Sequence, residues 1–251
     1  MANRRCVVVG IGGIGSWLSD GLVRMLEFKD PGSILILVDG DEFEPKNQER
    51  QSFGGLGNKA DVKAAELTPY FSKTFIAPKA QWIVESFDDP ELEETETAIT
   101  AKALLRDGDV VFAVVDNFSA RKILFDAARE FDNIDVFTGG NDDALFVSTY
   151  HYQRRDGVDI TDHPAEYHED FVNPPDRNPG LMSCQEKAML RGGTQLIASN
   201  ITAAAILMGR YQHTIIDGND PCSAGEIMFD LGVGLAQAKD RTAELILVPS
   251  N

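Results

Sequence analysis

Residues 5–26 read RCVVVGIGGIGSWLSDGLVRML, and this stretch decides the fold. The β-branched run over residues 5–9 predicts a short buried strand, and apolar side chains then recur at helical spacing from Ile14 onward. Between them lies a turn with the four glycines Gly10, Gly12, Gly13 and Gly15. This order is typical of a nucleotide site, because glycines let phosphate approach the backbone and a helix N-terminus offers unpaired N–H groups.

A carboxylate extends this pattern. The apolar run over residues 34–38 predicts a second buried strand, which ends at Asp39, and Asp41 follows two residues later. A carboxylate at that strand end can accept hydrogen bonds from the ribose hydroxyls of a nucleotide. The pattern does not distinguish NAD from ATP, and a tight turn without a ligand is the alternative interpretation.

Strands and helices alternate through the rest of the first half of the chain. Further strands are predicted over residues 74–84, 109–115 and 136–138, and helices over residues 59–71, 97–106 and 119–129. The alternation predicts an α/β fold with a Rossmann-like, doubly wound and mainly parallel sheet.

The pattern changes after about residue 143, where an antiparallel C-terminal extension is predicted. Residues 144–152 alternate like an antiparallel strand, and the charged, proline-containing residues 153–183 predict a long irregular segment with little core material. An apolar helix is expected over residues 193–211. A terminal hairpin, turning through Gly232 and Gly234, is predicted from residues 226–229 and 244–248.

Two polar side chains in the loop after Asp41 favour ATP over a dinucleotide. Asn47 and Arg50 stand three residues apart, where a dehydrogenase has no use for them. Arginine can hold phosphate oxygens in a planar fork, and asparagine can bind sugar or phosphate. An ordinary polar loop is the alternative interpretation.

A third group of polar residues follows the predicted strand over residues 109–115. Asp116 and Asn117 stand at the edge where open α/β sheets bind their ligands. An exposed carboxylate there suits Mg²⁺, which prefers oxygen ligands and usually bridges phosphates. A helix-capping role for Asp116 is the alternative.

Together these motifs resemble the ThiF/MoeB/ubiquitin-activating-enzyme superfamily. The set G-x-G-G-x-G-S, D-x-D, N-x-x-R-Q, N-K-A and D-N-x-x-x-R falls in family order over residues 10–121. The resemblance implies ATP- and Mg²⁺-dependent adenylation of the C-terminal glycine of a small ubiquitin-like or sulfur-carrier protein. It implies one adenylation domain over residues 1–251, with a nucleotide-binding half (1–143) and a carrier-binding half containing a crossover loop (144–251).

The resemblance also implies which residues bind the nucleotide. The four glycines would form the phosphate turn, and Asp39 would hold the ribose. Asp41 and Asn117 would lie in the same site. Asn47 and Arg50 would contact ATP, with Arg50 facing the phosphates.

Two further charges would act on the phosphates. Lys59 would neutralise phosphate charge, and Asp116 would coordinate Mg²⁺. Counting along the family pattern from Arg50 favours Lys63, one helical turn after Lys59. Counting from the following strand, together with the N-K-A context, favours Lys59, which we adopt.

The cysteines leave one question open. Three cysteines without a C-x-x-C pair predict neither a disulfide nor a cysteine-based zinc site. Cys184 follows the irregular segment, where the resemblance implies a cysteine that takes the carrier as a thioester or persulfide in some members and is dispensable in others. Cys6 and Cys222 are interpreted as structural.

The chain departs from the family pattern at its start. It begins almost directly at the first strand, so the helical segment that supplies an arginine to the partner's ATP in dimeric members is missing, and only Arg4 and Arg5 remain. The zinc-binding cysteine pairs and the appended domains are absent too. The resemblance still implies a homodimer, with a conjugating enzyme as a further partner.

Composition limits the alternatives. The 23 Lys and Arg stand against 40 Asp and Glu, and the resulting charge of −17 argues against nucleic acid as a partner. No stretch approaches the roughly 20 apolar residues of a membrane span, and no signal peptide is recognisable, so we expect a cytoplasmic protein with no membrane partner. Three other functions stay open: a tRNA- or small-molecule-adenylating relative of the threonylcarbamoyl-adenosine dehydratase type, an NAD-dependent oxidoreductase, and a non-catalytic nucleotide-binding scaffold.

Overall fold

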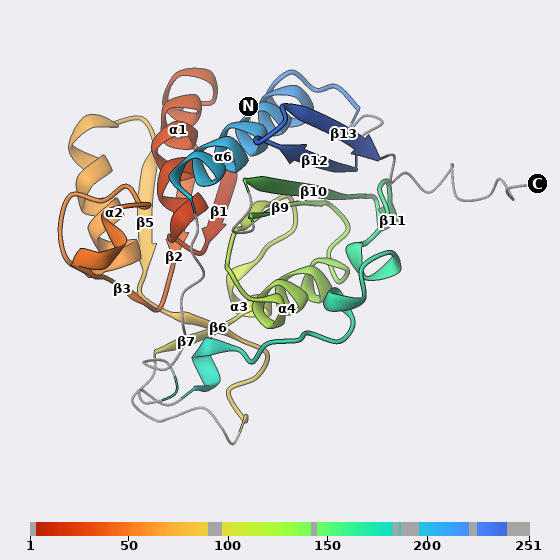
Figure 1. Ribbon diagram of the computed structural model, residues 1–251, viewed down its shortest axis with the longest axis horizontal. Helices are drawn as coiled ribbons and strands as arrows, with labels where there is room; N and C mark the ends of the chain where they lie inside the picture. Colours follow the sequence, from red (N-terminus) through yellow and green to blue (C-terminus); the bar gives the residue numbers. More distant parts are fainter. Residues whose placement is uncertain are drawn as a thin grey trace, which may run out of the picture.

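One sheet organises the chain (Figure 1). The computed structural model describes residues 4–89, 97–141, 145–182, 186, 196–220 and 225–239. In chain order the strands of the sheet are β1 (Arg5–Val9), β2 (Ile34–Val38), β5 (Phe75–Lys79), β8 (Val110–Ala113), β9 (Ile134–Asn141), β10 (Phe146–Arg155), β11 (Val158–Asp159), β12 (Glu226–Asp230) and β13 (Leu235–Lys239). Their spatial order is β13-β12-β10-β9-β8-β1-β2-β5, with β11 beside β10.

The sheet is parallel on one side and antiparallel on the other. Strands β5, β2, β1, β8 and β9 run parallel, while β10, β12 and β13 continue the sheet antiparallel from β9. The predicted Rossmann-like, mainly parallel sheet with an antiparallel extension is therefore confirmed. β1 lies at the centre of the parallel part, with Val9 opposite Val38 on one neighbour and Ala113 on the other.

Helices cover both faces of this sheet (Figure 1). One face carries α1 (Gly13–Lys29), α2 (Lys59–Leu67) and α6 (Ile197–Tyr211), and the other carries α3 (Ala101–Leu104) and α4 (Phe118–Ala128). A hydrophobic core lies on each face of the sheet, and alternate residues of β1 pack into each. Cys6 and Val8 pack on the α1 side, whereas Val7 and Val9 pack on the α4 side. A strand buried on both faces needs an unbroken apolar run, and this run is why β1 could be predicted from the sequence.

Two predicted elements are divided in the structure. Residues 74–84 form β5 and then β6 (Trp82–Val84), which leaves the main sheet and pairs in parallel with β7 (Ala98–Thr100). Residues 97–106 therefore begin as a strand, and only α3 is helical. Thr100 Oγ1 accepts a hydrogen bond from the Ala103 N–H at 3.3 Å and caps this late-starting helix.

The remaining short elements lie in the connections. They are β3 (Glu42–Phe43), β4 (Gly57–Asn58), the 3₁₀ turns η1 (Pro45–Asn47), η2 (Thr68–Tyr70), η3 (Pro164–Glu166), η4 (Glu169–Phe171) and η5 (Pro179–Leu181), and the π-helical turn η6 (Gln212–Ile216). Within the described ranges, no helix combines the length and apolar character needed to cross a bilayer.

The terminal hairpin was predicted with the wrong second strand. β12 pairs with β13, and the turn between them contains Gly232 and Gly234, as expected. The predicted partner, residues 244–248, lies outside the described residues. Leu235–Lys239 escaped prediction because it is an exposed edge strand with little apolar alternation.

The predicted long irregular segment over residues 153–183 is more ordered than expected. β10 continues to Arg155, and Asp156 and Gly157 turn the chain into β11 with φ values of 49° and 75°. This Asp-Gly pair is a hairpin signal of the type I′ kind, which the sequence analysis overlooked.

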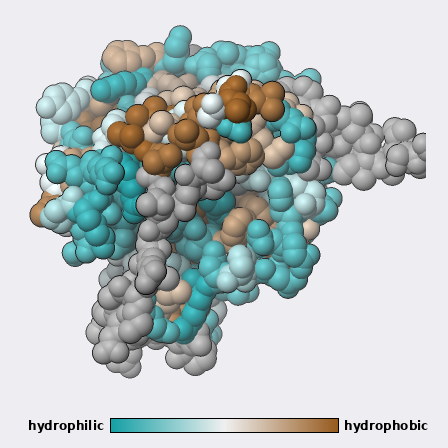
Figure 2. Space-filling model, in the orientation of Figure 1, coloured by the Kyte–Doolittle hydropathy of each residue, from teal (hydrophilic) through white to brown (hydrophobic). Residues whose placement is uncertain are grey.

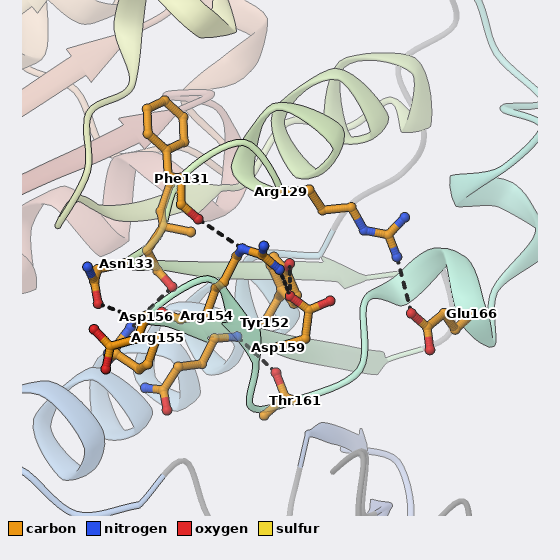
Figure 3. A network of polar contacts seen from close by, with 12 residues as sticks. Arg129, Phe131, Asn133, Tyr152, Arg154, Arg155, Asp156, Asp159, Thr161 and Glu166 are labelled. Carbon is orange, nitrogen blue, oxygen red and sulfur yellow. Dashed lines mark hydrogen bonds and ion pairs between the residues drawn. The ribbon is translucent and has the colours of Figure 1, made fainter.

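Polar contacts tie the same segment to its neighbours (Figure 3). Arg154 Nε donates to the Phe131 carbonyl at 2.9 Å, Tyr152 Oη donates to Asp159 at 2.7 Å, and Arg129 pairs with Glu166 at 3.1 Å. Further along, Phe171 is buried in the α4-side core. The expectation of little core material was therefore wrong, because single aromatic side chains carry no periodic pattern.

Helix α6 leaves apolar side chains on the surface. Leu196, Ile197 and Ile201 are exposed there, and the β12–β13 hairpin exposes Val233 and Leu235. Figure 2 shows the apolar surface over this part of the molecule. Contiguous apolar surface of this kind favours contact with another protein.

His163 makes the stability of the fold sensitive to acid. Its Nδ1 accepts a hydrogen bond from the Ala165 N–H at 3.2 Å, and its ring packs against Phe125 and Tyr152. Burial is the main cause that lowers the pKa of His163 to about 4. The neutral form is thus favoured in the fold, so the unfolded chain binds the extra proton first as the pH falls.

We expect the His163 contribution to be complete above pH 6.5 and to be lost as the pH falls toward 4. Its full size is on the order of 2–3 kcal/mol in the free energy of unfolding. Denaturant unfolding at pH 7 and pH 4.5 should show a smaller acid loss in His163→Asn, which keeps an acceptor for the Ala165 N–H. Equal acid loss in both proteins would contradict this assignment.

Candidate functional site

A cavity of about 630 Å³ lies at the carboxyl ends of β1, β2 and β8. Ligands of open α/β sheets bind at this edge, where neighbouring crossovers leave a crevice. The cavity is within the size range of small-molecule sites. From the predicted site, Gly10, Gly12, Gly13, Asp39, Asp41, Asn47, Arg50, Lys59, Asp116 and Asn117 all line it.

The glycine turn has two distinct tasks. Gly10 has φ +93°, and a Cβ there would lie 2.8 Å from the Val115 nitrogen. A Cβ on Gly15 would lie 1.8 Å from the Gly10 carbonyl oxygen, so Gly15 permits the close approach of α1 and does not line the cavity. Gly12 and Gly13 are on the cavity wall, where α1 begins without a side-chain cap. The N–H groups of this helix end can therefore donate hydrogen bonds to an anion.

Asp39 closes the turn from the end of β2. Its Oδ2 accepts a hydrogen bond from the Ile11 N–H at 2.6 Å, and its Oδ1 accepts one from the Asp41 N–H at 2.8 Å. Burial raises the pKa of Asp39, while the nearby Lys59 ammonium opposes this rise. A carboxylate fixed in this way beside the glycine turn is placed as a ribose acceptor requires.

Lys59 points into the cavity from the first residue of α2. Asn58 Oδ1 accepts from the Ala60 N–H at 2.9 Å and caps the helix, while Asn58 Nδ2 donates to the Asp39 carbonyl at 2.9 Å and ties the helix start to the end of β2. Lys59 Nζ lies 2.5 Å from Asp41 Oδ2 and is only 8% exposed. Burial lowers the pKa of Lys59, but Asp39 and Asp41 outweigh this effect and raise it, so the ammonium stays charged.

Lys63 lies elsewhere. It is fully buried between α2 and α1, where its Nζ pairs with Asp20 and Glu66 at 3.1 Å each. Its Nζ also lies 3.3 Å from Ser52 Oγ. Of the two lysines considered from the sequence, only Lys59 lines the cavity.

The loop with Asn47 and Arg50 forms another wall. Asn47 is buried, and its Oδ1 accepts from the Glu44 N–H at 2.8 Å, which closes η1 as a capping box. The Arg50 N–H then bonds to the Asn47 carbonyl at 3.1 Å. Asn47 thus shapes the turn that presents Arg50 to the cavity.

Gln51 is a cavity residue that the sequence analysis quoted but did not assign. It is buried, and its Oε1 has no hydrogen-bond partner among the described residues. Gln51 Nε2 lies close to Gly12: a Cβ added at Gly12 would be 4.0 Å from this nitrogen. A buried amide without an internal partner beside the glycine turn is suited to a polar ligand.

Asp116 and Asn117 differ in their surroundings. Asn117 is buried, and its Oδ1 accepts from the Ala120 N–H at 2.8 Å as the N-cap of α4. Asp116 is exposed on the cavity wall and makes no ion pair with a described residue. A single free carboxylate fits a Mg²⁺ ion that is held mainly by phosphate oxygens and water. No cluster of three metal-ligating side chains occurs among the described residues.

A further wall of the cavity is formed by residues that no sequence motif marked as part of a site. Trp82 of β6 lies against the backbone of Gly40, where a Cβ would be 2.3 Å from the indole. Asn178 and Pro179 also line the cavity, and Asn178 Nδ2 donates to the Ile83 carbonyl at 2.8 Å. Asp176 accepts from the Phe118 and Ser119 N–H groups of α4 and anchors the same segment.

The cavity continues onto the antiparallel half. Gly140 and Asn141 of β9 line it, as do Phe146, Ser148 and Tyr150, which are alternate residues on one face of β10. The predicted nucleotide site therefore opens directly onto the half that the sequence analysis assigned to the carrier. Cys184 lies outside the described residues.

The two N-terminal arginines are used away from this cavity. Arg5, at the amino end of β1, pairs with Asp109 at 2.7 Å and donates to the Leu104 carbonyl at 2.9 Å. Arg4 pairs with Asp30 at 2.9 Å. Neither lines the cavity, since amino and carboxyl ends of parallel strands lie at opposite edges.

Solved structures share this fold. PaaA superimposes with a TM-score of 0.64 at 20% identity over 95% of this chain and 64% of its own. Escherichia coli MccB with ATP gives a TM-score of 0.64 at 17% identity, over 96% of this chain and 64% of its own. The microcin C7 biosynthetic enzyme MccB with N-formylated MccA gives 0.66 at 17% over 96% and 65%.

Sequence comparison gives the family. "Ubiquitin-like modifier-activating enzyme 5" of Caenorhabditis elegans is 31% identical over 148 residues, which make up 57% of this chain and 33% of that enzyme. The chain thus spans a third of this relative and less than two thirds of the solved structures above. The ThiF family matches residues 1–212, most of the chain. This protein therefore belongs to the ThiF family.

Proposed function

We propose that this chain activates the C-terminal carboxylate of a small protein or peptide by adenylating it with Mg-ATP. The observation that supports this most is the convergence of the glycine turn, Asp39, Arg50, Lys59 and Asp116 on one cavity. The glycine turn and Asp39 alone would suit any nucleotide. Two cations and a free carboxylate beside them suit a triphosphate with Mg²⁺, and so favour ATP over NAD.

The reaction needs mainly positioning and charge neutralisation. A carboxylate oxygen of the substrate attacks the α-phosphorus of ATP, the bond from that phosphorus to the bridging oxygen breaks, and pyrophosphate leaves with its electron pair. Lys59 and Arg50 would offset the charge on the phosphates, and the N–H groups at the start of α1 would hold phosphate oxygens. Mg²⁺, held by Asp116, would withdraw charge from the phosphates.

The antiparallel side of the cavity would take the substrate's C-terminal tail. An extended tail can lie along the face of β10 formed by Phe146, Ser148 and Tyr150, and Gly140 leaves room beside them. Its carboxylate would then reach the nucleotide from the side of Asn141. This path requires no movement of the sheet, because the strand ends on the nucleotide side and the face of β10 belong to the same sheet.

The substrate class is proposed from the relatives. The C. elegans relative is named for activating a ubiquitin-like modifier, and MccB has been solved with the N-formylated MccA. We favour a ubiquitin-like or sulfur-carrier protein ending in glycine. A tRNA- or small-molecule-adenylating function is the second candidate. The homodimer, the conjugating enzyme and the cytoplasmic location stay predictions.

We expect ATP with Mg²⁺ to raise the melting temperature of the protein by several degrees and NAD to leave it unchanged. The reason is that only a triphosphate can use Arg50, Lys59 and Asp116 together. Differential scanning fluorimetry with ATP, ATP plus EDTA, and NAD measures this. Asp116→Asn should lose the Mg²⁺-dependent part of the shift. Stabilisation by NAD and none by ATP would overturn the proposed function.

The two lysines provide a matched pair. Lys59→Ala should lower ATP–pyrophosphate exchange by about 10²-fold, because an ammonium beside the phosphates is lost. Its unfolding free energy should fall less than that of Lys63→Ala, because Asp41, the ion-pair partner of Lys59, is exposed to solvent. Lys63→Ala should instead cost about 3 kcal/mol of stability, because Asp20 and Glu66 lose their buried partner. If Lys63→Ala stayed stable but lost pyrophosphate exchange, while Lys59→Ala kept it, Lys63 would be the lysine that acts on the phosphates.

A thioester step through Cys184 is proposed on the family resemblance alone. If Cys184 is the nucleophile, Cys184→Ala should keep pyrophosphate exchange and lose any reducible enzyme–carrier adduct. A non-reducing gel of enzyme, ATP and a glycine-terminated carrier, with wild type beside the variant, tests this. An adduct that persists in the variant would assign Cys184 a structural role.

A further inference from the structure

The loop that carries Arg50 is held through its backbone. The Arg50 carbonyl accepts two side-chain hydrogen bonds, one from Trp17 Nε1 of α1 and one from Asn200 Nδ2 of α6, each at 3.2 Å. Two residues later the Ser52 N–H donates to Ser16 Oγ at 3.0 Å. Side chains from two helices therefore fix a loop that has no regular hydrogen-bond ladder of its own.

Asn200 is the residue that joins both sides of the cavity. It lies in the first turn of α6 and is fully buried. While its Nδ2 donates to Arg50, its Oδ1 accepts from Asn141 Nδ2 at 3.0 Å. Arg50 lines the nucleotide side of the cavity and Asn141 the antiparallel side. One buried amide thus connects two cavity walls that are 91 positions apart in sequence (141 − 50).

We propose that Asn200 is a positioning residue, which holds Arg50 toward the phosphates of ATP and links that loop to Asn141. The inference rests on the proposed ATP-binding function. Asn200 does not line the cavity, so it acts on the nucleotide through the lining residues that it holds, and we assign its effect on the phosphates to Arg50. A buried amide that uses both its donor and its acceptor fixes direction, because rotation would lose both bonds.

The structure also gives a matched control. Ser199 precedes Asn200 on the same helix and is equally buried, but its Oγ has no hydrogen-bond partner among the described residues. Ser199→Ala therefore removes a polar atom at the same depth without touching the Arg50 loop. Any loss of nucleotide affinity seen in Asn200→Ala but not in Ser199→Ala is therefore due to the hydrogen bonds of Asn200 with Arg50 and Asn141.

The test is a double-mutant cycle on nucleotide affinity, measured by calorimetry with the unreactive analogue AMPCPP and Mg²⁺. Asn200→Ala should weaken AMPCPP binding about 5- to 10-fold, the range of one lost hydrogen bond, and Ser199→Ala should leave it unchanged. In an Arg50→Ala background, Asn200→Ala should change the affinity by less than about 2-fold, because the bond to the residue 50 carbonyl remains but the guanidinium that it positions is gone. A merely structural residue would give the same loss in both backgrounds.

The outcomes separate the two proposals. If wild type binds AMPCPP and Asn200→Ala binds equally well, or if the two losses add, the positioning role falls and the proposed function stands. If wild type itself does not bind AMPCPP, the proposed function falls and this inference falls with it. Should Asn200→Ala fail to fold, Trp17→Phe removes the other donor to the Arg50 carbonyl from a half-buried site, and it should show the same dependence on Arg50.

Discussion

The contact between Gly15 and the Gly10 carbonyl sets the geometry on which the site depends. Any side chain at Gly15 would overlap that oxygen, at 1.8 Å from its Cβ. This contact fixes where α1 starts relative to β1, and so where its free N–H groups point. Asp39 can then reach the turn through the Ile11 N–H, and Trp17 can reach the Arg50 loop.

Around this contact, the cavity is less acidic than the protein as a whole, because Lys46, Arg50, Lys59 and Arg121 line it together with Asp39, Asp41, Glu44 and Asp116. The net charge is −17, yet Lys59 and Arg50 both line the cavity. Asp39 and Asp41 keep Lys59 charged in spite of its burial. Single cations among carboxylates attract an anionic ligand only at short range, and screening by salt confines the attraction further.

The sequence predicted the parallel half well because its signals are strong there. β1 and β2 are unbroken apolar runs, and the glycine turn needs a residue without a side chain. Other features depend on contacts between distant residues. Trp82 forms a cavity wall only because β6 leaves the sheet, and Asn200 matters only through Arg50. The Asp156-Gly157 turn was readable and was missed, whereas the exposed β13 offered little pattern at all.

The unbroken hydrogen bonding from β5 across to β13 has a mechanical consequence. Many enzymes that join two substrates place them on separate lobes and bring these together by rotation about a hinge. In this fold the strand ends beneath the glycine turn and the face of β10 belong to one sheet, so no hinge lies between these two parts of the cavity. Under the proposed function, substrates would enter past the connecting segments that complete the cavity, such as the one anchored by Asp176 and Asn178. The fold itself would then set the distance between the nucleotide and the substrate tail, before either one binds.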